Sequence, residues 1–384
     1  MKLTAKLGEI APAKPLKRPN IDTKTDVWHL NLDQIESNSG QILKEIIAPI
    51  ADTKNSTHWF DERHVLYSKL RPYLNKVVVP DKYGVATTEL VPMMPDPERL
   101  KREYLAYYLK SDRFVHWVNA QVAGAKMPRV SMKVFWNHRI PLPPLPIQQK
   151  IATILDTADA LKQKDKALIA KYDELCQSLF LDMFGDPVTN PKGWELIKFA
   201  DVGKLDRGKS KHRPRNAPEL LGGKHPLIQT GDVANSGGYI KSYKSTYSDL
   251  GLKQSKMWKA GTLCITIAAN IAKTGILTFD ACFPDSVVGF IPNRKTNNEY
   301  IQYWMSFLQK ILEETAPSVA QKNINLRILR DLDIPTPPFE TQCLFKERLE
   351  AIEQQKQQAQ ASLQKSEDLF NCLLQKAFKG ELVS

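Results

Sequence analysis

The residues of this chain that are best suited to chemistry form a basic cluster near the middle of the sequence. Within twelve residues there are six lysines or arginines and one opposing carboxylate, Asp206. The basic members, with one histidine among them, are Lys204, Arg207, Lys209, Lys211, His212, Arg213 and Arg215. Pro214 and Pro218 predict a loop, and a basic loop can neutralise the phosphates of a nucleic acid. A loop that is merely solvated is the alternative interpretation.

The same segment satisfies the nucleotide-binding pattern G-x-x-x-x-G-K-[ST], from Gly203 to Ser210. In nucleotide hydrolases this loop follows a buried strand and opens a helix whose N-terminus faces the phosphates. A β-like run at 196–202 precedes the pattern, but the prolines after it oppose an immediate helix. A P-loop nucleotide hydrolase that uses Lys209 therefore stays an alternative.

Other basic, aromatic and amide side chains are candidates for contact with nucleic acid. They lie at 68–76, at 124–129 (GAKMPR) and in the matching segment 320–324 (AQKNI), with a few between. Arginine and lysine can address guanine, and glutamine and asparagine can address adenine. These candidates are Lys69, Arg71, Tyr73, Lys76, Lys126, Arg129, Gln229, Thr230, Lys273, Gln321, Lys322 and Asn323.

No set of residues for catalysis or metal binding stands out. The five cysteines form no C-x-x-C pair, and the seven histidines form no H-E-x-x-H pattern. Residues 336–339 (TPPF) approach the [DNS]-P-P-[YF] motif of amino-methyltransferases, but Thr336 replaces the required amide or carboxylate. No G-x-G occurs, so the glycine-rich loop expected for S-adenosylmethionine is absent. We expect a binding protein without catalysis, metal or cofactor of its own.

The composition agrees with a globular protein that binds a polyanion. The 384 residues carry 54 Lys and Arg against 42 Asp and Glu, a formal net charge of +12. Hydrophobic residues make up 42%, enough for packed cores, and the length suggests two or three domains. No apolar run approaches the ~20 residues that span a bilayer, and the first residues show no leader pattern. We expect a cytoplasmic protein.

The sequence is internally duplicated, and the duplication predicts how the elements are arranged. Residues 139–148 (RIPLPPLPIQ) return as 333–342 (DIPTPPFETQ), at an offset of 194 residues. Residues 6–10 (KLGEI) resemble 198–202 (KFADV), at an offset of 192. Two copies of one module predict a pseudo-two-fold protein. In each copy, short β-like runs and one helical stretch, at 98–122 and 298–314, predict an α+β globular domain.

A proline-rich hinge and a long helix follow each globular region. Four prolines between 141 and 146 oppose helix, and apolar residues then recur at heptad spacing, which predicts a coiled-coil seam. We expect each helix to have about 35 residues, ~50 Å, and to end at Gly185 or Gly380. The expected seam of the first helix is Ile147, Ile151, Ile154, Ala158, Leu161, Leu168, Tyr172, Leu175 and Leu179, with Asp165 as a polar break. The expected apolar seam of the second is Phe345, Leu349, Ile352, Leu363, Phe370 and Leu373, among polar members such as Lys356 and Ser366.

Residues 140–160 (IPLPPLPIQQKIATILDTADA) resemble the central region of specificity subunits of type I restriction-modification enzymes. Residues 173–187 (DELCQSLFLDMFGDP) and 208–215, leading to 229–233 (QTGDV), are also similar to that family. The resemblance implies an α+β fold with two similar target-recognition domains, each of mixed β-sheet plus helices, separated by two long antiparallel coiled-coil helices. We expect recognition domains at 1–140 and 186–333, and hinges with long helices at 141–185 and 334–384.

The resemblance also implies a sequence-specific subunit that binds a bipartite target in double-stranded DNA and is not itself an enzyme. Two methyltransferase subunits, acting on adenine N6, would bind to it, and motor-nuclease subunits would bind through them. S-adenosylmethionine, ATP and Mg²⁺ would belong to those partners, and no membrane is expected. Besides the nucleotide hydrolase, a coiled-coil DNA scaffold without sequence specificity is an alternative.

Overall fold

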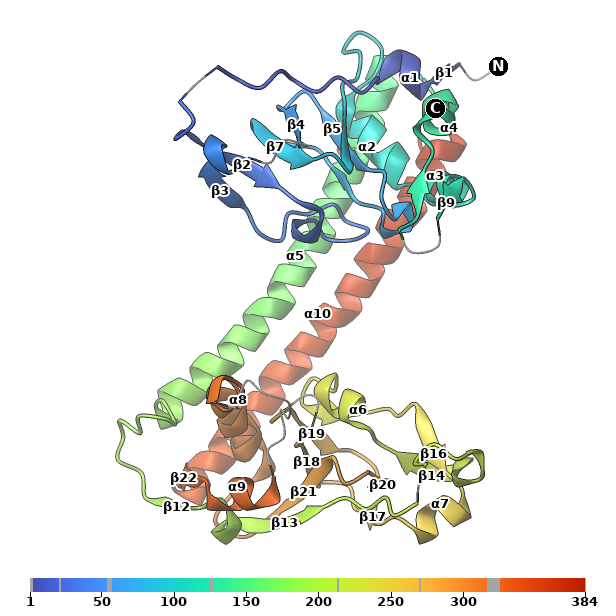
Figure 1. Cartoon of the computed structure of the whole chain (residues 1–384). Helices are drawn as coiled ribbons and strands as arrows, with labels where there is room; N and C mark the ends of the chain where they lie inside the picture. Colours follow the sequence, from blue (N-terminus) through green and yellow to red (C-terminus); the bar gives the residue numbers. More distant parts are fainter. Residues whose placement is uncertain are drawn as a thin grey trace. The chain divides into compact units, whose positions relative to one another are not determined.

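The computed structural model describes residues 3–20, 22–53, 57–124, 127–212, 214–268, 271–315 and 325–383 (Figure 1). The chain divides into two compact units, which are described separately. Unit 1 comprises Met1–Ala167 and Gln360–Ser384, and unit 2 comprises Leu168–Ala359. The two long helices, α5 (Leu145–Phe184) and α10 (Phe339–Lys379), each contribute residues to both units.

Unit 1 contains two small β-sheets with helices beside them (Figure 1). In order of pairing, the sheets are β3 (Ile46–Pro49), β2 (Asp26–Leu30), β7 (Gly84–Thr87), β4 (Thr57–Phe60), and β6 (Val77–Val78), β5 (Val65–Ser68), β8 (Leu90–Met93). Two further antiparallel pairs are β1 (Thr4–Lys6) with β11 (Arg139–Pro141), and β9 (Val122–Ala123) with β10 (Arg129–Val130). The short helices are α1 (Leu7–Ile10), η1 (Leu32–Gln34), η2 (Ile50–Asp52), η3 (Pro72–Leu74), α2 (Arg102–Lys110), α3 (Asp112–Asn119) and α4 (Met132–Asn137).

Unit 2 is built in a similar way from two larger sheets. The first is β13 (Gly203–Arg207), β21 (Val287–Pro292), β18 (Leu263–Thr266), β19 (Thr274–Leu277), β15 (Tyr239–Ile240). The second is β16 (Ser245–Tyr247), β14 (Leu221–Leu227), β20 (Ala281–Cys282), β17 (Met257–Trp258), and β12 (Leu196–Lys198) pairs with β22 (Asp333–Pro335). The short helices are η4 (Phe199–Asp201), η5 (Pro218–Leu220), α6 (Thr230–Ala234), α7 (Asp249–Lys253), α8 (Asn298–Thr315) and α9 (Leu326–Asp331).

The duplication of the sequence is also a duplication of structure. Thr4 pairs with Pro141 in unit 1, and Leu196 pairs with Pro335 in unit 2. In both units, the first strand of the copy therefore pairs with the strand at the hinge. The Tyr104 hydroxyl donates to the carbonyl of Pro141 (3.1 Å), as the Tyr300 hydroxyl does to that of Pro335 (2.6 Å). The predicted α+β fold with two similar globular domains and two long helices is therefore confirmed.

One predicted helix is in fact two. The stretch 98–122 contains α2 and α3, which are separated at Ser111, and it ends in β9. Ser111 is the N-cap of α3, and its hydroxyl accepts a hydrogen bond from the backbone N–H of Phe114 (3.4 Å). A serine cap that begins a new helix competes with continuation of the old one, which explains the break.

The long helices exceed the predicted length, with 40 residues in α5 and 41 in α10. Helix α5 begins at Leu145, before the last proline of the hinge, because Pro146 lies in the first turn, where no backbone N–H is needed. Both helices end where glycine was expected to end them. Gly185 and Gly380 follow the last turns with φ of +78° and +81°, a left-handed conformation that glycine adopts without strain.

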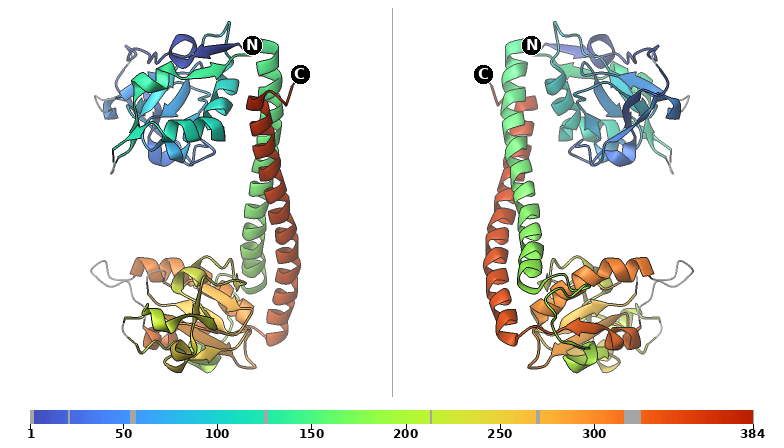
Figure 2. Two further views of the ribbon diagram at one scale, coloured as in Figure 1. Left: turned by 90° about the vertical axis from the view of Figure 1, so that its right-hand side faces the viewer. Right: turned by 90° about the vertical axis from the view of Figure 1, so that its left-hand side faces the viewer.

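Within each unit, α5 and α10 pack side by side and antiparallel, as both views in Figure 2 show. In unit 1, Ser366 Oγ lies 2.8 Å from Asp165 Oδ2, and the Lys162 ammonium lies 4.1 Å from the centre of the Phe370 ring. In unit 2, the Lys356 ammonium forms an ion pair with Asp173. Rising numbers in one helix thus meet falling numbers in the other.

The seam of α5 differs from the predicted one by a single position on one of its two rows. The row with Ile151 and Ala158 is buried, but its partner row is Leu155, Lys162 and Cys176, which are at most 8% exposed. Leu161, Leu168 and Leu175 are 45%, 41% and 48% exposed and lie outside the seam, while Ile147 and Ile154 are partly buried. Apolarity alone favoured the wrong row because the true one contains the polar Gln148 and Lys162.

The seam of α10 has the predicted rows. Phe345 and Leu349 are buried, and the other four are partly buried: Ile352, Leu363, Phe370 and Leu373. Its polar members Lys356 and Ser366 are buried as well, and both are paired with carboxylates of α5. In α5, Tyr172 and Leu179 are likewise partly buried.

A buried glutamine ties each hinge to its long helix. Gln148 is fully buried; its Nε2 donates to the carbonyls of Arg99 and Pro143, both at 2.8 Å, and its Oε1 accepts from the Lys101 N–H at 2.9 Å. Gln342 makes the equivalent bonds in unit 2, to Lys295, Pro337 and Asn297. Without these bonds, backbone groups in and beside an irregular, proline-rich segment would lack hydrogen-bond partners.

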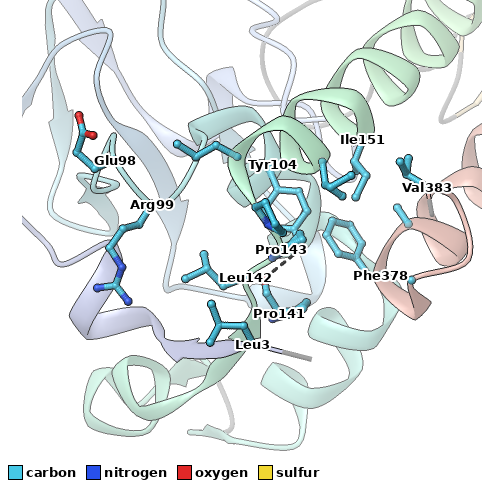
Figure 3. Close-up of a pocket in the computed structure, with 15 residues that line it drawn as sticks. Leu3, Glu98, Arg99, Tyr104, Pro141, Leu142, Pro143, Ile151, Phe378 and Val383 are labelled. Carbon is cyan, nitrogen blue, oxygen red and sulfur yellow. Dashed lines mark hydrogen bonds between the residues drawn. The ribbon is translucent and has the colours of Figure 1, made fainter. Parts of the chain in front are cut away.

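Beside the hinge of unit 1 lies an apolar cavity of about 640 Å³ (Figure 3). Leu142, Ile151 and Phe378 line it, and the Tyr104 hydroxyl bonds to the Pro141 carbonyl within it. Its charged members, Glu98 and Arg99, lie together at one end, as Figure 3 shows. The lining suits packing against apolar groups and offers few partners to a phosphate.

Candidate nucleic-acid interface

In unit 1, two separate segments of the candidate residues lie against each other. Leu70 and Arg129 form an isolated β-bridge, the Arg71 N–H donates to the Pro128 carbonyl (2.8 Å), and the Val130 N–H donates to the Lys69 carbonyl (3.2 Å). These backbone contacts bring together the two segments that carry the residues we call the unit 1 basic surface: Lys69, Arg71, Tyr73, Met127 and Arg129.

The chain turns sharply at Arg71, within the unit 1 basic surface. Arg71 has φ of +48°, in the left-handed region that non-glycine residues rarely adopt, and it caps η3. Arg71 is exposed, and Tyr73 and Met127 are each 50% exposed. An exposed arginine, an exposed aromatic ring and an exposed thioether on these adjoining segments offer both charge for phosphates and apolar area for bases.

Arg129 is held by a carboxylate that the sequence analysis did not single out. Its Nε lies 3.2 Å from both oxygens of Glu89, and its Nη2 lies 2.8 Å from Oε1. The hydrogen bond from Arg129 keeps the pKa of Glu89 below its ordinary value, so Glu89 is ionised at neutral pH. The Lys69 N–H donates to the Glu89 carbonyl at 3.0 Å, which fixes the glutamate to the same surface.

The two other basic candidates of unit 1 are Lys76 and Lys126. The Lys76 ammonium donates to the Leu32 carbonyl (2.7 Å), so this lysine supports η1. Lys126 lies outside the described residues.

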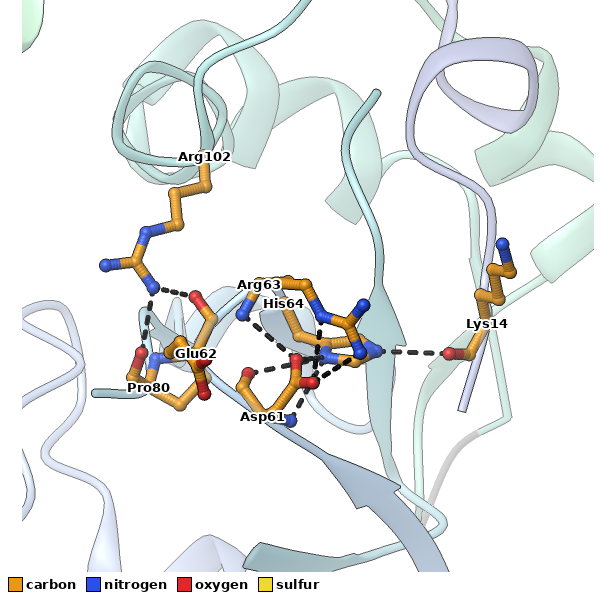
Figure 4. A network of polar contacts seen from close by, with 7 residues as sticks. All are labelled: Lys14, Asp61, Glu62, Arg63, His64, Pro80 and Arg102. Atoms are coloured by element: carbon orange, nitrogen blue, oxygen red, sulfur yellow. Dashed lines mark hydrogen bonds and ion pairs between the residues drawn. The ribbon is translucent and has the colours of Figure 1, made fainter. Parts of the chain in front are cut away.

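A polar network at the turn between β4 and β5 holds the N-terminal segment in place (Figure 4). His64 is fully buried, with Nδ1 2.9 Å from Asp61 Oδ1 and Nε2 3.1 Å from the Lys14 carbonyl. Burial alone would raise the pKa of Asp61, but hydrogen bonds from Arg63 outweigh burial and hold that pKa below its ordinary value. The network is satisfied within the fold and supports unit 1 structurally.

In unit 2, the nucleotide-binding pattern is not a phosphate loop. Gly203–Arg207 form strand β13, which pairs with β21 along its length. Among the described residues after Ser210, no helix follows directly; the next helical turn is η5, at Pro218–Leu220. The backbone N–H groups that would surround a phosphate at a helix N-terminus are therefore not available. The alternative of a nucleotide hydrolase is therefore not supported.

The basic segment after β13 is held against the end of α7. The backbone N–H groups of Lys211 and His212 donate to Gln254 Oε1 (2.7 and 3.1 Å), and the Ser255 hydroxyl donates to the Lys209 carbonyl (2.8 Å). We call Lys209, Lys211, His212 and Arg215 the unit 2 basic loop. Lys253 and Lys256, which flank Gln254 and Ser255, add to its positive charge.

Two arginines of the predicted cluster are bound to Asp285. The Arg207 guanidinium donates to the Asp285 carbonyl (2.9 and 2.7 Å), and Arg215 forms an ion pair with its carboxylate. These contacts fix the loop on both sides. The lysines of the unit 2 basic loop, Lys209 and Lys211, are exposed.

The remaining candidates lie elsewhere in unit 2 or outside the described residues. Gln229 caps α6, which Thr230 begins, and its N–H donates to Asp232 Oδ2 (2.9 Å). Lys273 lines a polar cavity of about 450 Å³ together with Asp173 and Gln177 of α5. The candidates outside the described residues are Arg213, Gln321, Lys322 and Asn323.

The described residues offer neither a cluster of metal ligands nor a membrane-spanning helix. Among the described residues, no three or more histidine, cysteine, aspartate or glutamate side chains come together in a way that could hold a metal ion. In that same part of the chain, no helix combines the length and apolar composition needed to cross a membrane.

Comparisons of the sequence identify relatives. A family model described as "Type I restriction modification DNA specificity domain" matches residues 5–171 and again 191–365. The putative type I restriction enzyme MjaX specificity subunit of Methanocaldococcus jannaschii is 21% identical over 91% of this chain and 83% of its own length. The type I restriction enzyme EcoDI specificity subunit of Escherichia coli is 24% identical over 46% of this chain, which corresponds to 38% of that subunit.

Two solved structures share the fold. One, described as "Structural basis underlying complex assembly and conformational transition of the type I R-M system", has a TM-score of 0.61 at 19% identity, over 99% of this chain and 98% of that one. The other, the type I restriction-modification system S subunit from M. genitalium, has a TM-score of 0.57 at 15% identity, over 98% and 96%. Because the family model covers both copies of the duplicated fold, this chain belongs to the type I restriction-modification specificity-subunit family and carries two DNA specificity domains.

Proposed function

We propose that this specificity subunit recognises a bipartite target in double-stranded DNA, with one half-site bound by each unit. The observation that carries the proposal is a pair of basic surfaces that differ in sequence and structure on a frame that is the same in both units. Lys69, Arg71 and Arg129 surround a β-bridge in unit 1, whereas Lys209 and Lys211 lie on a loop held by α7 in unit 2. Since the surfaces differ, the two half-sites should differ in sequence.

Catalysis would belong to partner subunits. The relatives are named as specificity subunits of type I restriction enzymes, which supports the presence of other subunits. Those partners would methylate adenine N6 and cleave DNA. S-adenosylmethionine, ATP and Mg²⁺ would be bound there, and the complex would act on DNA in the cytoplasm. The duplicated frame offers two equivalent places, which favours two methyltransferase subunits for each chain.

Exposed leucines of α5 in unit 2 are the docking surface that we propose for one of these methyltransferase subunits. Leu168 and Leu175 lie seven residues apart on one face of the helix, with 41% and 48% of each exposed. Apolar side chains exposed at heptad spacing mark a surface on which another protein can pack.

The long helices would determine the spacer between the half-sites. The 40 residues of α5 correspond to about 60 Å, and the major groove of DNA recurs about every 34 Å. A helix pair of fixed length would then allow only a narrow range of distances between the two half-sites.

The proposal is tested by sequencing the methylated bases in a host that expresses this chain with its methyltransferase partner. The expected result is one motif with two unlike half-sites, separated by a constant number of unspecified bases, which disappears when this chain is omitted. Methylation or DNA protection that is independent of sequence would instead support a non-specific scaffold.

A further inference from the structure

Arg129 and Glu89 have a geometry suited to reading a base pair. The contact to Glu89 uses the side of the guanidinium that carries Nε and one N–H of Nη2. At the opposite end, formed by the second N–H of Nη2 and an N–H of Nη1, the one contact to a described residue is a long one of 3.5 Å, from Nη1 to the Met127 carbonyl. Two parallel donors therefore remain, and 42% of the Arg129 side chain is exposed.

Two parallel N–H groups match the O6 and N7 acceptors of guanine in the major groove. Arginine could also contact a phosphate in this way, but the adjacent carboxylate of Glu89, which is ionised and 21% exposed, would repel a phosphate. A carboxylate can instead accept from the N4 amino group of the cytosine that pairs with guanine. The N–H donors of Arg129 therefore match the acceptors of guanine, and the carboxylate acceptor of Glu89 matches the amino donor of cytosine.

The segment next to this pair is basic. Lys69 and Arg71 flank Leu70, which forms the β-bridge with Arg129, so they would supply positive charge for the DNA backbone, and the Lys69 N–H fixes Glu89. Because Glu89 holds the guanidinium from the side, Arg129 loses little conformational freedom when it binds.

We propose that Arg129 recognises the guanine of one G·C pair in the half-site bound by unit 1, and that Glu89 is the residue that positions Arg129. The inference rests on the proposed function, since it assigns a base to a surface already proposed to bind DNA.

The test uses the complex of the full chain with its methyltransferase subunits. Competition binding is measured with duplexes in which each base pair of the half-site is changed in turn. Wild type should prefer one G·C pair about tenfold or more over any replacement. Arg129→Lys, which keeps the charge but removes the fork, should reduce that preference to about twofold or less and leave the other positions unchanged. Glu89→Gln, which keeps the volume, should reduce the same preference about threefold or more.

The matched control is Lys82→Gln, which removes an exposed ion pair with Glu45 elsewhere in unit 1 and should leave every preference unchanged. An unchanged G·C preference in Arg129→Lys overturns the inference, and so does an equal loss at all positions, which would mark a phosphate contact. If circular dichroism shows that neither variant folds, the pair is structural and the inference is wrong. If wild type itself shows no bipartite target, the proposed function fails first, which separates the two failures.

Discussion

Asp165 of α5 accepts a hydrogen bond from the hydroxyl of Ser366 of α10, with 2.8 Å between Oδ2 and Oγ. The two residues are only 8% and 4% exposed, within a seam that is otherwise mostly apolar. Ser362 Oγ lies 3.3 Å from each carboxylate oxygen. A buried carboxylate is costly unless it is paired, so a shift of one helix against the other would leave Asp165 without partners. We infer that this pair selects the register of the two helices in unit 1.

Removing the hydroxyl of Ser366 should therefore destabilise the protein. Ser366→Ala is expected to lower the free energy of unfolding by about 1–3 kcal/mol, because the carboxylate loses its closest donor. Asp165→Leu combined with Ser366→Ala should restore the stability or exceed it, since an apolar pair replaces a polar one. Urea unfolding of the three proteins measures both effects. A Ser366→Ala variant as stable as wild type would show that the bond contributes nothing.

Gln148 should matter more for stability than its neighbour Gln149. Gln148→Leu removes the hydrogen bonds of Gln148 to the Lys101 N–H and the Arg99 carbonyl, both part-buried, which should cost about 1–3 kcal/mol in total. Gln149 is exposed, so Gln149→Leu is the matched control and should be close to neutral. Unfolding followed by tryptophan fluorescence compares the two variants. Equal stabilities would mean that the hinge finds other partners.

The long helices show how far the sequence could predict the structure. The duplicated frame, the two long helices and their glycine ends follow from the repeat and from local backbone preferences. The buried row of α5 with Gln148 and Lys162 could not be predicted from the heptad pattern, because that pattern counts apolar residues and these two are polar. The repeat offset of 194 residues does indicate the correct row, since Leu349 and Lys356 of the α10 seam correspond to Leu155 and Lys162.

The candidate interface was predictable only in part, because side-chain partners depend on long-range contacts. Composition indicated Arg71 and Arg129 but not that a β-bridge joins their segments, nor that Glu89 holds Arg129. Likewise, a short pattern left a phosphate loop open as an alternative, whereas β-pairing with β21 makes Gly203–Arg207 a strand.

Acid should weaken unit 1 through His138. Burial, with a smaller contribution from the charge of Arg113, lowers the pKa of His138 to about 4, against about 6.5 in the unfolded chain. Between these two pH values the unfolded chain binds a proton that the folded chain does not, so stability falls as the pH is lowered through this window. His138→Gln should remove this part of the dependence. The check is the midpoint of thermal unfolding as a function of pH; parallel curves for the two proteins would assign the acid sensitivity to other groups.

The exposed leucines of α5 should affect partner binding and not folding. Leu168→Ser with Leu175→Ser is expected to change the free energy of unfolding by less than about 0.5 kcal/mol per site, because both side chains are solvent-exposed. Affinity for the methyltransferase subunit should fall about tenfold or more, since each leucine would lose its buried apolar area in the complex. Titration calorimetry gives the affinity.

Leu181→Ser is the control for that pair, because Leu181 is 40% exposed on the same helix but outside the heptad row. Its affinity for the methyltransferase should equal that of wild type. A double variant that binds as tightly as wild type would exclude this row as the docking surface.

Whether each unit recognises one half-site is tested most directly by the methylated motif of a chimaera. Residues 186–333 are replaced by the matching region of another specificity subunit, while the hinges and long helices of this chain are kept, and the methylated DNA of the host is sequenced. One half-site should change to that of the donor, while the other half-site and the spacer stay the same. A motif in which both half-sites change, or in which neither does, would contradict recognition of one half-site by each unit.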